Sequence, residues 1–162
     1  RPFNSLNAIE NVLIGLGFGR TKPLTKRNRV AEALRLLQVV GLENKVNHVA
    51  EGLTLVEKKH LEIARALATA PEILLLDEVV SGLNPTEVTQ IIETIQQIRA
   101  GGITIIMIEH ILKVVMELCE RVVVLNYGIQ IAAGTPKEVV NDEAVIEAYI
   151  GRFESAEEKS YA

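Results

Sequence analysis

The stretch Pro71-Glu72-Ile73-Leu74-Leu75-Leu76-Asp77-Glu78 is the strongest indicator of fold in this sequence. Its aliphatic residues follow one another without alternation, which is typical of a strand buried on both faces of a parallel sheet. Asp77 and Glu78 come where that strand ends, and ligands of open α/β sheets bind beyond the carboxyl ends of the strands. Two interpretations fit: a Walker B arrangement, in which Asp77 supports a Mg²⁺ ion and Glu78 acts on water, or a core strand ending in two solvated acids.

The residues after Glu78 predict a second strand parallel to the first. Asn84-Pro85-Thr86-Glu87 has the pattern of a capping box, so we expect a helix to begin there and to end at Gly101-Gly102. Ile103–Ile108 is a second run, apolar apart from Thr104, which predicts another buried strand and is followed by Glu109-His110. Two buried strands joined by one crossover helix form a βαβ unit, so the predicted class is α/β with a mainly parallel sheet. This geometry places His110 beside the acidic pair; the alternative is an ordinary loop or N-cap histidine.

The first 70 residues predict helices. One is expected over residues 7–15, closed by Gly15, and a second after Thr25, which can act as its N-cap. A third runs from the polar loop near residue 53 to about Ala70, where Pro71 disfavours helical geometry. The spacing predicts two buried apolar stripes: Val30, Ala33, Leu34, Leu37 and Val40 before Gly41, and Val88, Ile91, Ile92, Ile95 and Ile98 on the crossover helix.

The last 50 residues predict a hairpin between helices. Leu112, Val115, Met116 and Cys119 trace a helix. Residues 121–127 are expected to form a third strand, joined through Gly128 to a fourth over residues 129–133. Thr135-Pro136-Lys137-Glu138 is another capping box, which opens a closing helical segment that reaches about Ile150. The tail after residue 153 is polar.

One segment is strongly basic. Gly19–Arg29 carries Arg20, Lys22, Lys26, Arg27 and Arg29 and no acid. Such a run indicates either a contact with lipid headgroups or a partner, or a solvated loop that leads into a helix.

Composition excludes several classes of protein. The 162 residues suffice for one domain or a large piece of one, and a formal net charge of -4 argues against a nucleic-acid binder. The single cysteine, Cys119, excludes an intrachain disulfide framework and indicates a reducing compartment. No apolar run approaches the roughly 18 residues that a membrane span needs. Because the chain starts with Arg1, we expect a processed product, a truncation or a fragment of a longer polypeptide.

The order of these elements resembles the C-terminal part of an ABC transporter ATPase subunit, and most closely the ATPases of branched-chain amino-acid uptake systems. The residues that carry the resemblance are Leu61–Leu67, Ile73–Glu78, Ser81–Glu87, Ile108–His110 and Gly134–Glu138. The resemblance implies the C-terminal part of a P-loop NTPase domain: a mainly parallel sheet flanked by helices, with part of the helical subdomain. It divides the chain into a helical-subdomain portion (1–70), an α/β core portion (71–151) and a polar tail (152–162).

The resemblance also implies roles for particular residues. Asp77 matches the carboxylate that supports Mg²⁺, Glu78 the catalytic glutamate that polarises water, and His110 the switch histidine that touches the γ-phosphate of ATP. The loop that crosses to the partner subunit corresponds to Ser81, Gly82 and Asn84, and the signature loop to Thr54, Leu55, Val56 and Glu57. In this family the signature loop of one subunit closes over ATP held by the other.

Three departures from the family pattern affect what can be expected. No Gly-x-x-x-x-Gly-Lys-Ser/Thr occurs in the 162 residues, so the amides and lysine that cradle phosphates are absent from this sequence. The family's Leu-Ser-Gly-Gly-Gln is here Leu53–Glu57, in which Leu55 and Val56 restrict close backbone approach and Glu57 adds negative charge. Asn84 stands where many relatives have Asp, although Asn-Pro is familiar in the branched-chain subgroup.

The leading hypothesis is therefore an ATP-binding and ATP-hydrolysing subunit of an ABC importer for branched-chain amino acids. It would be peripheral on the inner face of the cell membrane and pair with a second ATPase subunit and an integral membrane permease. We expect ATP and Mg²⁺ to bind the full-length parent and this chain to be inactive alone. Two alternatives stay open: a non-transport ABC ATPase, and a non-catalytic interaction module that kept the scaffold. A sheet without its remaining strands also exposes apolar surface, which predicts self-association.

Overall fold

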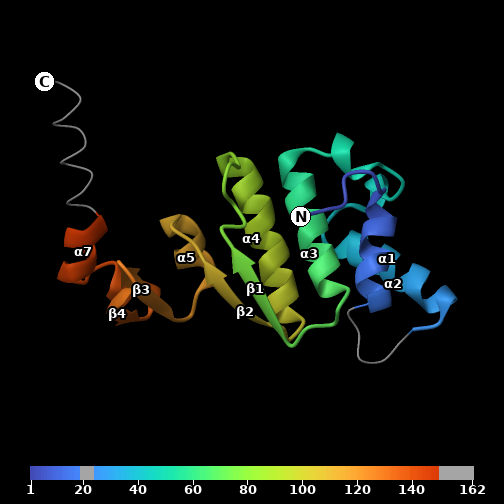
Figure 1. Ribbon diagram of the computed structural model, residues 1–162. Coiled ribbons are helices and arrows are strands. Elements are labelled where there is room, and N and C mark those ends of the chain that lie inside the picture. Colours follow the sequence, from blue (N-terminus) through green and yellow to red (C-terminus); the bar gives the residue numbers. More distant parts are fainter. Residues whose placement is uncertain (19–23, 150–162) are drawn as a thin grey trace, which may run out of the picture. The chain divides into compact units, whose positions relative to one another are not determined.

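A computed structural model of the chain describes residues 1–18 and 24–149 (Figure 1). Contacts divide the chain into two compact units, Arg1–Glu109 and His110–Ala162. The elements of the first unit are α1 (Ala8–Phe18), α2 (Lys26–Val39), the 3-10 turns η1 (Glu43–Lys45) and η2 (Ala50–Gly52), α3 (Leu55–Leu67), β1 (Ile73–Asp77), α4 (Pro85–Ala100) and β2 (Thr104–Ile108). Those of the second are α5 (Leu112–Leu118), β3 (Val122–Asn126), β4 (Ile129–Gly134), α6 (Pro136–Val139) and α7 (Glu143–Tyr149).

The predicted N-caps form as expected. Thr25 Oγ1 accepts the backbone N–H of Asn28 at 3.3 Å, so α2 begins where the sequence indicates. At α4, Asn84 Oδ1 accepts the N–H of Glu87 at 3.1 Å, and Glu87 Oε2 accepts the N–H of Asn84 at 2.9 Å. Pro85 occupies the first turn, and the whole predicted stripe of α4 is buried. These local hydrogen bonds satisfy backbone groups that a helix end leaves without a partner.

Helix α1 does not end at Gly15, as predicted, but continues to Phe18. The reason is the packing of α1 on α3. A Cβ added to Gly15 would lie 2.8 Å from the carbonyl oxygen of Arg65 and 2.8 Å from Cβ of Ala68. Only a glycine permits this approach, so Gly15 marks a helix contact and not a helix end.

The apolar stripe of α2 is only partly buried. Ala33 and Leu37 lie in the core, together with Leu36, which the pattern did not single out. Val30 and Leu34 were expected on the same buried face, but 40% and 43% of their surfaces remain exposed. The prediction was wrong for these two residues, because the contact with α1 and α3 covers a face of α2 that is rotated from the one the spacing suggested.

Strands β1 and β2 pair in parallel, with Ile73 opposite Thr104 and Asp77 opposite Ile108. This confirms the βαβ unit. The prediction that both strands are buried on both faces was wrong. Leu74 and Leu76 are buried, whereas 54% of Ile73 and 72% of Leu75 is exposed. Successive side chains of a strand point to opposite faces, so one face is covered and the other lies open in the described structure.

The second unit contains an antiparallel hairpin. Strands β3 and β4 pair, with a register shift between Val124 and Leu125, and Tyr127 and Gly128 form the turn with φ values of 49° and 80°. A two-residue turn with both residues at positive φ matches the twist of a hairpin. The predicted capping box forms at α6, where Thr135 Oγ1 accepts the N–H of Glu138 at 3.4 Å.

One prediction for this unit differs from the structure. The closing segment is not one helix: α6 ends at Val139 and α7 starts at Glu143. Asp142 Oδ1 accepts the N–H of Ala144 at 2.9 Å, which starts the new helix. The helix predicted from Leu112, Val115, Met116 and Cys119 forms as α5, in which Val114 and Leu118 are buried while Leu112 and Met116 are exposed. The predicted polar tail lies outside the described residues.

Candidate functional site

The acidic pair lies at the carboxyl end of β1, beside the end of β2. The backbone N–H of Glu78 donates to the carbonyl of Ile108 at 2.9 Å, which extends the parallel ladder by one residue. Asp77 points to the open face of the sheet, and both carboxylates are exposed. The strand ends therefore present two acids to solvent at the edge where parallel sheets bind ligands.

Glu78 has an unusual backbone. Its φ is 44°, in the left-handed region that a non-glycine residue seldom adopts and that stores strain. Val79 and Val80 come next and are 6% and 0% exposed, so they anchor the turn in the core. The carbonyl of Glu78 accepts the N–H of Ser81 at 3.1 Å. The buried valines thus hold Glu78 in a conformation that turns the chain sharply at the end of β1.

Glu109 supports this turn and was not singled out in the sequence. Its Oε1 accepts the N–H of Val80 at 3.3 Å, and its Oε2 is buried without a hydrogen-bond partner in the structure. The bond ties the segment after Glu78 to the end of β2. The sequence signal that could have indicated a role for Glu109 was its position as the first acid after the second aliphatic run.

His110 is the first residue of the second unit. It follows Ile108, which pairs with Asp77, by two positions in the chain. Its predicted place next to the γ-phosphate stays a prediction, as do the roles of Asp77 and Glu78.

The predicted crossing loop is compact. Gly82 has a φ of 80°, which explains a glycine at this position, and Ser81 and Asn84 are exposed. The N–H of Leu83 donates to the carbonyl of Val80 at 3.2 Å. The loop is therefore fixed at one end by the buried valines and at the other by the cap of α4.

The predicted signature loop forms the start of α3. Thr54 is the N-cap: its Oγ1 accepts the N–H of Glu57 at 3.3 Å, and Glu57 Oε2 accepts the N–H of Thr54 at 2.9 Å. Val56 is buried in the core, whereas 47% of Leu55 is exposed. Of these four residues, Val56 serves packing and the other three face solvent at least in part.

Glu57 is held as a carboxylate. Partial burial acts to raise its pKa, but the hydrogen bond from the Thr54 N–H and the nearby Lys45 ammonium together lower the pKa below its ordinary value. Lys45 Nζ lies 3.4 Å from Glu57 Oε1. The side chain of Glu57 thus closes the start of α3, as a Gln in a capping box also would, and the Glu adds a negative charge that pairs with Lys45.

The structure brings the signature loop and the crossing loop together within the first unit. A Cβ added to Gly82 would lie 3.2 Å from Cδ2 of Leu55. Lys59 Nζ donates to the carbonyl oxygen of Glu78 at 3.4 Å. Helices α3 and α4 both begin at the end of the unit where β1 ends (Figure 1). Lys59 was missed in the sequence because nothing in its spacing relates α3 to the end of β1.

The end of β1 offers the carboxylates of Asp77 and Glu78 as possible oxygen ligands. Among the described residues, no group of three or more His, Cys, Asp or Glu side chains could hold a metal ion. Mg²⁺ in nucleotide sites takes one or two carboxylates and completes its shell with phosphate and water. The exposed pair Asp77 and Glu78 fits that requirement.

Comparison with known families identifies the class. The model of the ABC transporter family matches residues 1–81. That of the branched-chain amino acid ATP-binding cassette transporter matches residues 130–154. The chain belongs to the ABC transporter family. The fold is that of an ABC ATPase domain, as the sequence predicted.

Curated relatives come from two kinds of transport system. The chain is 39% identical to the high-affinity branched-chain amino acid transport ATP-binding protein LivG of Salmonella typhimurium, over 93% of this chain and 64% of the relative. It is 34% identical to the lipopolysaccharide export system ATP-binding protein LptB of Acidithiobacillus ferridurans, over 92% of this chain and 61% of the relative. The chain thus spans somewhat less than two thirds of the length of these relatives.

Solved structures agree with this assignment. The ADP conformation of MJ1267, an ATP-binding cassette of an ABC transporter, superposes with a TM-score of 0.79 at 28% identity. The match covers 91% of this chain and 64% of that one.

Proposed function

We propose that this chain is part of the ATP-binding subunit of an ABC importer for branched-chain amino acids. The relatives support branched-chain amino acids as the transported solutes, because the chain is more similar to LivG than to LptB. The family match at residues 130–154 is also to the branched-chain subgroup. Export of lipopolysaccharide is the second candidate, favoured by the similarity to LptB. In this proposal the subunit works as a dimer on the inner face of the membrane, bound to a permease. None of the helices within the described ranges is long and apolar enough to cross a membrane.

The turn at Glu78 is the observation that supports a catalytic role for this residue. A carboxylate held at a φ of 44°, at the end of a parallel strand and next to a second carboxylate, is the arrangement that a strained catalytic turn requires. Such strain persists only where the surroundings determine it, as Val79 and Val80 do here. The arrangement therefore favours a catalytic glutamate over a solvated acid.

Each residue of the site has a different role in this proposal. Asp77 would hold Mg²⁺, which neutralises charge on the phosphates when bound. Glu78 would accept a hydrogen bond from the attacking water and orient it towards the γ-phosphate. His110 would donate a hydrogen bond to the γ-phosphate. Thr54, Leu55 and Glu57, together with Ser81, Gly82 and Asn84, would form the surface that meets the second subunit.

The test uses the full-length subunit with its permease. Glu78→Gln removes the negative charge that orients water and keeps the size of the side chain. We expect hydrolysis to fall by roughly 100-fold or more, since loss of a general base typically costs about 100-fold to 10,000-fold, while ATP still binds. Hydrolysis is measured by phosphate release and binding by calorimetry. Glu93→Gln, on the exposed side of α4, is the matched control and should leave both unchanged.

Two results would overturn the proposal. Turnover that survives Glu78→Gln would remove Glu78 from the chemistry. Tight ATP binding by the 162 residues alone, measured by the same calorimetry, would contradict the expectation that the phosphate cradle lies outside this sequence. Transport assays with leucine and with lipopolysaccharide as alternative cargo then separate the two candidate systems.

A further inference from the structure

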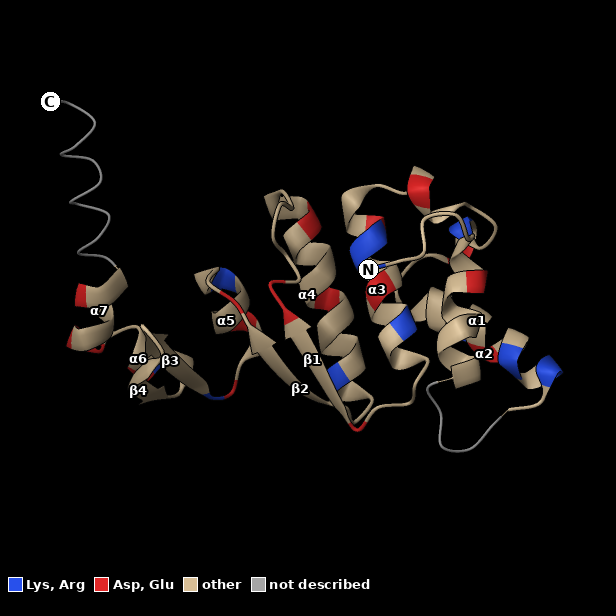
Figure 2. Ribbon diagram, viewed as in Figure 1, with Lys and Arg blue, Asp and Glu red and all other residues tan. Residues whose placement is uncertain are grey.

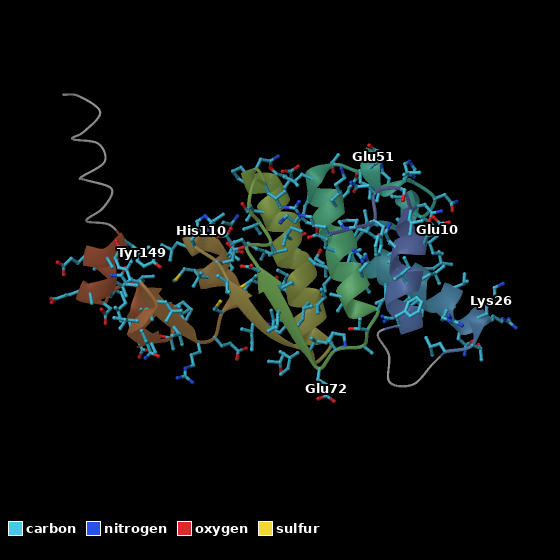
Figure 3. All side chains as sticks on the ribbon, viewed as in Figure 1. Glu10, Lys26, Glu51, Glu72, His110 and Tyr149 are labelled. Atoms are coloured by element: carbon cyan, nitrogen blue, oxygen red, sulfur yellow. The ribbon has the colours of Figure 1, made fainter. Side chains whose placement is uncertain are left out.

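The start of α2 is a cationic surface on an acidic chain. The whole sequence has a net charge of -4, yet it contains no acid between Glu10 and Glu32. Within α2, Lys26 and Arg27 are exposed and Arg29 is partly exposed. Figure 2 shows the basic positions at the beginning of this helix, and Figure 3 labels Lys26 in its first turn. The first acid of the helix, Glu32, lies 2.8 Å from a fourth cation, Arg35, so positive charge predominates along α2.

Apolar side chains lie open on the same helix. Val30 is 40% exposed and Leu34 is 43% exposed, and they are separated by one helical turn. Phe18, the last residue of α1, is 89% exposed. These are the residues for which the stripe prediction was wrong or which no pattern explained. We call Phe18, Lys26, Arg27, Val30 and Leu34 the α2 patch.

The end of α1 belongs to this patch by position. A Cβ added to Gly17 would lie 3.6 Å from a guanidinium nitrogen of Arg29. The last turn of α1 therefore lies against the first turns of α2, and Phe18 follows Gly17 directly. The core face of α2, with Ala33, Leu36 and Leu37, is buried separately. Among the described residues, the α2 patch is therefore exposed and separate from the buried face of α2.

We propose that the α2 patch contacts an anionic lipid surface directly. A face that combines cations with exposed aliphatic and aromatic side chains fits the boundary between headgroups and acyl chains, where the cations meet lipid phosphate and the apolar groups enter the interface. A solvated helix start would explain the cations but not the exposure of Phe18, Val30 and Leu34 beside them. An acidic protein partner would explain both, and the experiment separates it from lipid.

The experiment is vesicle flotation with the full 162-residue chain, because aggregates stay at the bottom of the gradient. One set of vesicles is phosphatidylcholine alone, and the other contains about 30 mol% phosphatidylglycerol, which supplies the negative surface potential. We expect the chain to float with the anionic vesicles and not with the neutral ones. Flotation should fall in about 0.5 M salt, where exposed charges are screened over a few ångströms.

Variants assign the binding to the patch. Lys26→Glu with Arg27→Glu should weaken binding by roughly tenfold or more, since two attractive charges become repulsive. Arg121→Glu with Lys137→Glu makes the same change in net charge on exposed residues of the second unit and should have little effect. Leu34→Ser should weaken binding by a smaller factor, and Leu112→Ser, at a 57% exposed position, is its control.

Three outcomes would overturn the proposal. The first is the absence of flotation with anionic vesicles. The second is flotation that Lys26→Glu with Arg27→Glu leaves unchanged but Leu75→Ser with Ile106→Ser abolishes, which would assign binding to the open sheet face. The third is binding that appears only in vesicles containing the permease, which would assign the patch to a protein. Circular dichroism of each variant confirms that the fold is retained.

Discussion

Both faces of the β1–β2 sheet are largely aliphatic, but one is covered and the other is open. On one face, Leu74 and Leu76 are buried, at 4% and 8% exposure. On the other, Leu75 and Ile106 stand opposite each other in the ladder and are 72% and 54% exposed. The crossover helix of a βαβ unit packs on one face of its sheet, and the buried stripe of α4 supplies that cover here.

This contrast indicates that another surface packs on the open face. An aliphatic face gains nothing from water, and a surface of this kind usually marks an interaction site. Asp77 lies on the same face as Leu75, so whatever covers the aliphatic residues also borders the acidic pair. A continuous aliphatic run therefore predicts correctly that a strand has two apolar faces. It does not predict whether other residues of the chain bury each face.

The largest expected effect is a difference in the free energy of unfolding between substitutions on the covered face and on the open face. Leu74→Ala should lower the free energy of unfolding by about 2–5 kcal/mol, because it leaves a cavity in a packed layer. Leu75→Ala changes the same residue type one position away and should shift that free energy by about 0.5 kcal/mol or less. Urea unfolding followed by circular dichroism measures both. Equal losses would mean that the open face is covered in solution.

A second experiment asks whether copies of the chain cover each other. We expect the mass measured by light scattering to rise with protein concentration, because the open face is apolar. Leu75→Lys with Ile106→Lys should return it to the monomer mass. Val123→Lys with Leu125→Lys alters aliphatic positions of β3 that are 49% and 56% exposed, and serves as the control. A clean monomer at all concentrations of the unchanged chain would contradict self-association.

The smallest expected effect concerns a polar contact behind the covered face. His60 of α3 is 8% exposed, and its Nε2 lies 3.2 Å from Thr94 Oγ1 of α4. Burial lowers the pKa of His60 below 6.5, against the opposing influences of the Gln90 backbone and the charge of Glu57. The unfolded chain then binds the proton more readily than the folded one. Stability is therefore complete above about pH 6.5 and decreases as the pH falls below that value.

The matching variant is His60→Gln, which should flatten the dependence of the unfolding free energy on pH between about 7 and 5. His48→Gln changes an exposed histidine and should leave that dependence as it is. The measurement is urea unfolding at a series of pH values. An unchanged slope in His60→Gln would show that the α3–α4 contact does not exclude the charged imidazole.

Much of the local structure could be predicted from the sequence. Thr25, Asn84 and Thr135 cap their helices as expected, and Gly128 lies in the hairpin turn as expected, although Tyr127, which was expected in the strand, also belongs to that turn. Each of these features depends on hydrogen bonds or backbone angles within about four residues, so neighbouring residue types are enough to predict it. The acidic pair could also be placed at a strand end, because Asp77 and Glu78 are adjacent in the chain to the aliphatic run.

The surroundings of the candidate site could not be predicted in this way. Lys59 and Glu109 approach the turn at Glu78 from α3 and from the end of β2, and no spacing in the sequence relates Lys59 to that turn. The same holds for Leu55 and Gly82, which come from segments 27 positions apart and lie against each other. Such contacts depend on how helices pack on the sheet.

The caps, the hairpin turn, the βαβ order and the family could thus be read from the amino-acid sequence alone, because these features depend on neighbours in the chain. Tertiary packing was needed to establish that Gly15 is a helix contact, that Val30 and Leu34 face outward, and that one face of β1 and β2 is open. Burial depends on the free energy of removing apolar surface from water, and that surface is covered by residues distant in sequence.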